Sequence, residues 1–263
     1  MQQLEKIAKN FAKNNTYKAT SQFVSKKDYQ IVADKQEQKI TFHPLKEHKN
    51  TLIWLHGLGD SADGFAPIFA SPQNFTSENT KIILPTAPTR KVTINGGYPC
   101  TAWYDIVSLE RNENQSDENL YNQEQVNESV QYVSDIIDNE LSILNGKNKN
   151  IYIGGFSQGG VMALATAYTY PQILGGVFSH SGYLISSVKL QHKLNVGLIH
   201  GKQDQVVVFK YGWGSYSRIY DDPEQKIESY IDDYMGHEVT LDSLGKLKQW
   251  FAQFNQQNQK DQQ

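Results

Sequence analysis

A serine set between glycines carries the clearest chemical signal in this chain. Residues 155–159 read Gly-Phe-Ser-Gln-Gly, with Ser157 at the centre. The apolar run 151–153 precedes the motif and the Ala-rich stretch 161–168 follows it, so we expect a strand to turn sharply into a helix at the serine. Such a turn lifts the hydroxyl above a sheet, where the helix N-terminus favours developing negative charge. The motif therefore predicts a serine nucleophile, with an ordinary glycine-rich turn as the alternative.

A serine hydroxyl needs a neighbouring base to become a good nucleophile, so a histidine should follow further along the chain. His180 and His200 stand at the ends of apolar runs, where a histidine is more often structural, and His192 lies in a polar stretch. His237 follows the last apolar run in a loop, directly after a glycine, which lets its ring reach back over the sheet edge. We predict that His237 is the base; a histidine on a surface loop is the alternative.

The acid that orients such a histidine should follow the last apolar run but one. Asp204 is the only carboxylate in the dozen residues after 196–199. Its role would be to hold the imidazole tautomer and to stabilise the imidazolium. An aspartate of an ordinary turn is the alternative, and Asp221 and Asp222 are the fallback acids.

Two backbone N–H groups should stabilise the oxyanion of a tetrahedral intermediate. The residue after the nucleophile supplies one of them, here Gln158. The loop Leu-His-Gly-Leu-Gly-Asp at 55–60 ends the third apolar run, and its glycines allow an unusual backbone path. We expect the N–H of Leu58 to be the second donor.

Strand-like and helical patterns alternate along the chain, and they must position these residues. The apolar runs suit strands buried on both faces, and they stand at 29–33, 39–42, 51–55, 81–84, 151–153, 176–179, 196–199 and 227–231. Helical patterns cover 126–144, 161–168 and 241–254. This predicts an α/β fold with a single, mostly parallel eight-stranded sheet, helices on both faces and an antiparallel first pair of strands. We expect one domain over 26–255, with an exposed loop at 112–125.

Composition and charge argue against several classes of protein. The 263 residues hold 25 Lys and Arg against 28 Asp and Glu, and the formal net charge of -3 lacks the basic excess that nucleic-acid binding needs. The single cysteine, Cys100, excludes an internal disulfide and a cysteine metal cluster. No stretch approaches the ~20 apolar residues that span a bilayer, and the first residues lack the apolar core of a secretory signal. We therefore expect a cytoplasmic protein.

The two ends of the chain are expected to flank the main domain. Residues 1–25 should form an N-terminal amphipathic helical segment, because Leu4, Ile7 and Phe11 recur at helical spacing. We expect this helix to dock on the domain; the alternatives are transient contact with a membrane surface and a weak organellar presequence. Residues 256–263 are all polar and should form a frayed tail.

Taken together, these motifs resemble the acyl-protein thioesterase, lysophospholipase and carboxylesterase family of α/β-hydrolases. The match runs through LHGLGD (55–60), PTAP (85–88), AWYDI (102–106), GFSQGG (155–160), HGKQD (200–204) and GH (236–237). The resemblance implies the α/β-hydrolase fold and a catalytic triad of Ser157, Asp204 and His237. It also implies acyl thioesters or oxygen esters as substrates, S-acylated proteins among them, and no metal or cofactor. The acid loop departs from the family pattern at Lys202 and Gln205, which predicts altered loop packing with the acid retained.

The sequence indicates the chemistry of the site more clearly than it indicates the preferred substrate. Candidates to line an acyl pocket are Phe65, Ile68, Phe69, Trp103 and Tyr104, with ordinary core packing as the alternative. By resemblance, residues 90–99 form the loop that shapes the acyl channel, and Gly96-Gly97 stand there in place of a bulkier run. We expect a palmitoyl-protein thioesterase. The alternatives are a broad carboxylesterase or lysophospholipase, a non-catalytic binding module, and a peripheral membrane protein.

Overall fold

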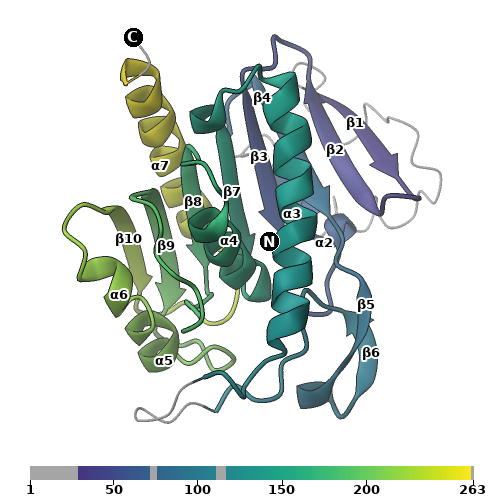
Figure 1. Ribbon diagram of the computed structural model, residues 1–263, viewed down its shortest axis with the longest axis vertical. Coiled ribbons are helices and arrows are strands. Elements are labelled where there is room, and N and C mark those ends of the chain that lie inside the picture. Colours follow the sequence, from purple (N-terminus) through teal and green to yellow (C-terminus); the bar gives the residue numbers. More distant parts are fainter. Residues whose placement is uncertain (1–28, 72–75, 111–116, 262–263) are drawn as a thin grey trace.

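The computed structural model describes residues 29–71, 76–110 and 117–261 (Figure 1). The helical segment expected at 1–25 lies outside these residues. In the described residues the chain builds one large sheet, a small hairpin and helices packed on both sides of the large sheet. The limits predicted for the domain and its flanking segments stay a prediction.

The large sheet has the eight strands that the apolar runs predict. Their order is β1 (Tyr29–Asp34), β2 (Lys39–Pro44), β4 (Thr80–Pro85), β3 (Asn50–Leu55), β7 (Ile151–Phe156), β8 (Gly176–His180), β9 (Asn195–Gly201) and β10 (Lys226–Asp232). β2 pairs antiparallel with both β1 and β4, and the pairs from β4 to β10 are parallel. The α/β-hydrolase fold and the antiparallel first pair are thus confirmed, in a sheet that is mixed.

Alternate residues of the central strands supply two separate cores. Ile53 and Ile153 point into the core under α3 (Gln123–Ile143) and α4 (Gln158–Thr169), which lie on the near face of the sheet in Figure 1. Leu52 and Tyr152 point into the opposite core, under α2 (Ala62–Ala70) and α7 (Leu241–Lys260). Since side chains alternate along a strand, apolar residues at every position are what a sheet covered on both faces requires.

The sequence analysis did not predict several of the shorter elements. The segment expected to be a loop at 90–99 holds the antiparallel strands β5 (Thr89–Val92) and β6 (Tyr98–Thr101). Gly96 and Gly97 turn the chain between them, and both have positive φ, a conformation that glycine adopts without a Cβ clash. α2 and two short helices, α5 (Phe209–Gly214) and α6 (Ser217–Tyr220), were also unforeseen.

Two polar segments are more ordered than their composition suggests. The loop expected at 112–125 ends earlier, because α3 begins at Gln123, and Asp117 is buried where its carboxylate accepts the backbone N–H of Ser186. Likewise, α7 continues to Lys260, four residues beyond the start of the expected tail at 256. Asn258 is buried there, and its side-chain amide donates to the carbonyl of Gly175. In both segments a polar side chain finds backbone partners far away in the sequence.

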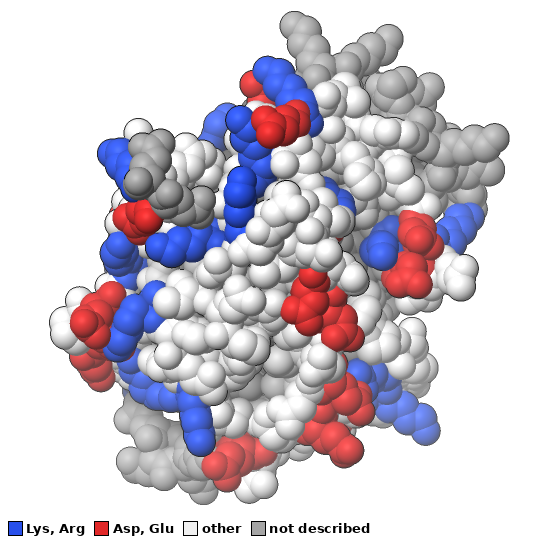
Figure 2. Space-filling model, turned by 45° about the horizontal axis from the view of Figure 1, so that its top comes forward, with Lys and Arg blue, Asp and Glu red and all other residues white. Residues whose placement is uncertain are grey.

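Charged side chains of both signs are interspersed on the surface. On the face seen in Figure 2, Lys and Arg lie beside Asp and Glu around a broad uncharged area. Ion pairs such as Lys46–Glu78 and Lys202–Asp233 are part of this pattern. Among the described helices, none combines the length and apolar character that a bilayer crossing demands.

Phe251 of α7 offers a test of the second core. Its side chain is 1% exposed and its ring lies 4.7 Å from that of Tyr152. We expect Phe251→Ala to lower the free energy of unfolding by about 3–5 kcal/mol, because the truncation leaves a cavity under the sheet. Urea denaturation followed by circular dichroism measures this. Leu241→Ala, at an exposed position of the same helix, should change it by less than about 0.5 kcal/mol; equal effects would contradict the assignment of the core.

Candidate active site

Ser157 stands at a strained turn between β7 and α4. Its φ of 54° and ψ of -122° are unusual for a residue with a side chain, and its backbone N–H donates to the carbonyl of His180 over 2.8 Å. The turn is closed so tightly that a Cβ at Gly155 would lie 2.3 Å from the backbone of Gly159, and one at Gly159 would lie 2.1 Å from the carbonyl oxygen of Leu55. The two glycines of the motif are therefore required by close backbone approach.

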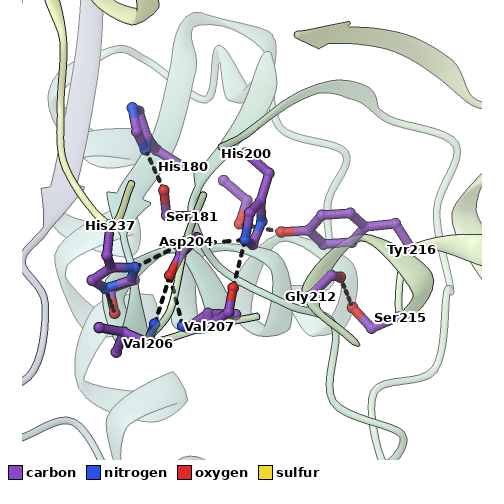
Figure 3. Close-up of polar contacts among 12 residues, drawn as sticks. His180, Ser181, His200, Asp204, Val206, Val207, Gly212, Ser215, Tyr216 and His237 are labelled. Carbon is purple, nitrogen blue, oxygen red and sulfur yellow. Dashed lines mark hydrogen bonds and ion pairs between the residues drawn. The ribbon is translucent and has the colours of Figure 1, made fainter. Parts of the chain in front are cut away.

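His237 lies between the serine and an aspartate. Its Nε2 is 2.9 Å from the Ser157 hydroxyl. Its Nδ1 is 2.7 Å from a carboxylate oxygen of Asp204 (Figure 3). The Nδ1–H must donate to the carboxylate, which leaves Nε2 free to accept the hydroxyl proton. The three residues follow β7, β9 and β10, so the carboxyl edge of the sheet brings together the three side chains that the sequence singled out.

Asp204 is buried but well supplied with hydrogen-bond donors. One carboxylate oxygen accepts the backbone N–H groups of Val206 and Val207, over 2.9 and 2.8 Å. Burial alone would raise the pKa of this carboxyl, but hydrogen bonds from His200 and His237 outweigh burial and hold the pKa well below its usual range. The carboxylate therefore stays ionised beside His237. Of the fallback acids, Asp222 pairs with Lys193 instead.

His200, expected to be structural, is a second partner of this acid. It is fully buried, and its Nε2 lies 2.8 Å from the carbonyl oxygen of Val207 and 3.4 Å from the Asp204 carboxylate (Figure 3). Because both neighbours are acceptors, Nε2 carries the proton. Nothing in the sequence distinguishes this contact from those of an ordinary strand-end histidine.

The two expected oxyanion donors belong to segments that meet at the serine. Gln158 is the first residue of α4, so its backbone N–H has no acceptor within the helix. The loop that carries Leu58 lies against the turn, since a Cβ at Gly57 would be 3.3 Å from the Cβ of Ser157. Neither N–H has an acceptor within the described part of the chain.

The side chain of Gln158 has a role that its position in the motif did not reveal. Its amide nitrogen donates to the carbonyl of Tyr104 over 2.7 Å, and its amide oxygen accepts the backbone N–H of Trp103 over 2.9 Å. His56 braces the facing loop in a similar way: its Nδ1 donates to the carbonyl of Gly57, and its Nε2 accepts the N–H of Ala87. Both oxyanion segments are thus tied to the surrounding backbone by uncharged groups.

The expected acyl-pocket residues lie deeper than a binding surface. Trp103 and Tyr104 are fully buried, and the indole N–H of Trp103 donates to the carbonyl of His56. Phe65 is buried too, with its ring 6.0 Å from that of Phe156 beside the serine, and Ile68 is half-buried. These residues support the walls of the site from behind, and Phe65 reaches the triad through Phe156. Their contact with an acyl chain stays a prediction.

One more histidine lies beneath the site. His180 is fully buried, with its Nδ1 3.0 Å from the Ser181 hydroxyl (Figure 3). Its Nε2 lies 2.9 Å from the Ser243 hydroxyl. Burial, helped by the charges of His200 and His237, lowers the pKa of His180 to about 3. The imidazole is therefore neutral, and both of its nitrogens are engaged by hydroxyl groups.

Comparison with known proteins places this geometry among acyl hydrolases. The profile of a family described as phospholipase/carboxylesterase matches residues 36–255. The chain is 38% identical to acyl-protein thioesterase 1 homolog 1 of Dictyostelium discoideum, over 66% of this chain and 76% of that protein. It is 30% identical to acyl-protein thioesterase 1 of Saccharomyces cerevisiae, over 77% and 92%. The crystal structure of SOBER1 from Arabidopsis thaliana is similar with a TM-score of 0.68 and 28% identity, over 78% of this chain and 99% of that one.

The buried His180 predicts acid sensitivity. Its pKa is lowered by folding, so between about pH 6.5 and 3 the unfolded chain binds a proton that the folded chain excludes, and stability falls as the pH falls. From pH 7.5 to pH 5, His180 should remove about 2 kcal/mol of the free energy of unfolding. The His180→Gln variant has no titrating group at this position. We therefore expect its free energy of unfolding to fall by about 2 kcal/mol less than that of the unaltered protein between pH 7.5 and pH 5. Urea unfolding at each pH measures this; parallel losses would contradict it.

Proposed function

This chain belongs to the phospholipase/carboxylesterase family and is a serine hydrolase, and from that premise we propose that it cleaves the acyl thioesters of S-acylated proteins with Ser157, His237 and Asp204. The observation that carries the proposal is the continuous hydrogen-bonded path from hydroxyl to imidazole to carboxylate, with distances of 2.9 and 2.7 Å. The backbone N–H groups of Leu58 and Gln158, which have no acceptor in the described part of the chain, are the proposed oxyanion donors.

The first half of the reaction transfers the acyl group to the enzyme. The Ser157 oxygen attacks the thioester carbonyl carbon while its proton moves to Nε2 of His237. The ionised Asp204 stabilises the resulting imidazolium, and the backbone N–H groups of Leu58 and Gln158 stabilise the oxyanion. When the tetrahedral intermediate collapses, the carbon–sulfur bond breaks and the imidazolium gives its proton to the departing cysteine sulfur. The acyl chain is then esterified to Ser157.

The second half of the reaction frees the enzyme with water as nucleophile. His237 takes a proton from a water molecule, whose oxygen attacks the acyl-enzyme carbonyl. The second tetrahedral intermediate collapses, the bond from carbon to the serine oxygen breaks, and His237 returns the proton to that oxygen. The fatty acid leaves, and no step requires a metal or a cofactor.

The thioester is favoured by the names of two relatives, since those from Dictyostelium discoideum and Saccharomyces cerevisiae are acyl-protein thioesterases. A second candidate, hydrolysis of oxygen esters, is favoured by a relative described as a probable carboxylesterase of Arabidopsis thaliana, 31% identical over 77% of this chain. The same oxyanion forms in both reactions, so the triad chemistry does not separate the two substrates.

Labelling and a substrate series test the proposal together. A fluorophosphonate probe should label the unaltered protein and fail to label Ser157→Ala, because the probe reacts with an activated serine. The value of kcat/KM should then be higher for S-palmitoyl peptides than for the matched oxygen esters or for lysophospholipid. Labelling that persists in Ser157→Ala would overturn the assignment of the nucleophile, and a preference for oxygen esters would make the protein a carboxylesterase.

The Asp204→Asn substitution tests how the acid orients the imidazole, because the variant keeps His237 itself. An amide at this position keeps the shape of the side chain but favours the wrong imidazole tautomer, so kcat should fall by about four orders of magnitude with the fold intact. Steady-state hydrolysis of nitrophenyl butyrate measures the loss. Asp222→Asn, at the fallback acid on the surface, is the matched control and should leave kcat within about twofold.

A further inference from the structure

His180 joins the turn that carries the serine to the helix that follows the base. It is the last residue of β8, and its carbonyl accepts the backbone N–H of Ser157. Its ring reaches the other way, to the Ser243 hydroxyl in the first turn of α7, over 2.9 Å. Phe156 packs between the two histidines, with ring centroids 5.4 Å from His180 and 4.9 Å from His237.

The hydrogen bonds around Ser243 determine which nitrogen of His180 donates. The Ser243 hydroxyl donates its single proton to the carbonyl of Thr240 over 2.9 Å, and its oxygen accepts the backbone N–H of Thr240 over 3.0 Å. The bond with His180 must then come from Nε2–H, and Nδ1 accepts the hydroxyl proton of Ser181. His180 is thus a neutral donor to a buried acceptor, and neither side chain is exposed to solvent.

The same serine belongs to the structure that starts α7. Thr240 and Ser243 form a reciprocal capping box, in which each side chain accepts the backbone N–H of the other. His237 lies only three residues before Thr240, in the segment 233–240 between β10 and α7. On its other side, the carbonyl of Met235 accepts the N–H of Gln203 from the acid loop. The segment that carries the base is therefore held on one side by the acid loop, through Met235 and Asp233, and on the other side by the start of α7, which His180 contacts.

We propose that the His180–Ser243 hydrogen bond positions His237 over Ser157, which makes His180 a positioning residue for the reaction; this inference rests on the proposed function. Because β8 also holds the backbone of Ser157, one residue fixes both the nucleophile and the segment of its base. A displacement of about 1 Å between reacting groups is enough to slow an enzyme by on the order of 100-fold. An apolar residue at 180 would fill the same space but leave Ser243, at the start of α7, without this bond to β8.

Two substitutions at 180 separate the hydrogen bond from packing. His180→Met fills the volume without a donor, whereas the amide of His180→Gln can still donate to Ser243. With nitrophenyl butyrate we expect kcat of His180→Met to fall by about 10- to 100-fold, with KM unchanged within about threefold, because the loss concerns geometry in the transition state. His180→Gln should recover kcat to within about threefold of the unaltered protein. The far-downfield proton resonance of Nδ1–H in His237 should weaken only in His180→Met.

A second pair of variants keeps the test valid should His180→Met not fold. Ser243→Ala removes the acceptor of His180, whereas Thr240→Ala removes a side chain of the same capping box and leaves the His180–Ser243 bond in place. Both should lower Tm, since both weaken the cap, but only Ser243→Ala should lower kcat. In the double variant His180→Met with Ser243→Ala, kcat should equal that of the slower single variant, because both remove one bond.

These experiments distinguish a failure of the positioning proposal from a failure of the proposed function. The proposal is overturned by a His180→Met enzyme with undiminished kcat, by equal losses in the Met and Gln variants, or by multiplying losses in the double variant. It is overturned as well by equal kcat in Ser243→Ala and Thr240→Ala. An unaltered protein that neither hydrolyses nitrophenyl butyrate nor reacts with fluorophosphonate would instead overturn the proposed function.

Discussion

The strained backbone at Ser157 is the constraint on which the rest of the site depends. A residue with a side chain at a φ of 54° persists only when its surroundings hold it there, and here β7, α4 and the carbonyl of His180 do so. The turn admits no Cβ on either flanking glycine, because one at Gly155 would meet the backbone of Gly159 and one at Gly159 would meet the carbonyl oxygen of Leu55. The loop at 55–60 carries Leu58, whose N–H is the proposed second oxyanion donor, so this proposed donor and the strained serine belong to segments in close contact.

Around this turn, charged and uncharged groups stabilise different parts of the site. Asp204 keeps its negative charge although it is buried, because two backbone N–H groups and two histidines surround the carboxylate. The oxyanion walls, by contrast, are braced by the neutral side chains of Gln158 and His56. The ionised acid thus faces the imidazole, whereas uncharged side chains hold the backbone that carries the proposed oxyanion donors.

Much of this arrangement was predictable from the sequence, because it depends on local patterns. The eight apolar runs predict the eight strands of the large sheet, and the motif at 155–159 predicts the turn at Ser157. The loop glycine before His237 and the spacing of Asp204 after β9 were sufficient to select these two side chains, which the fold brings to the serine. Each of these signals is contained in a few neighbouring residues.

The features that the sequence did not reveal are contacts between distant segments. Gln158 was chosen for its backbone N–H, but its side-chain partners lie more than 50 residues away. His180 and His200 were both expected to be structural, and only the packing shows that one bonds α7 and the other the acid. Asp117 and Asn258 belong to polar stretches whose composition favours exposure, yet each is buried against carbonyl or N–H groups of remote backbone. Periodicity predicts which face is apolar, whereas such bonds depend on the finished fold.

The long sequence separation between Ser157, Asp204 and His237 has a consequence for the synthesis of the protein on the ribosome. His237 lies 80 residues after Ser157 and 33 after Asp204, and its segment is anchored by the first turn of α7. A nascent chain that has emerged only as far as β9 contains Ser157 without His237, and the two side chains meet only after the segment that follows β10 has been translated. Synthesis itself therefore delays assembly of this site until all eight strands of the large sheet have been translated.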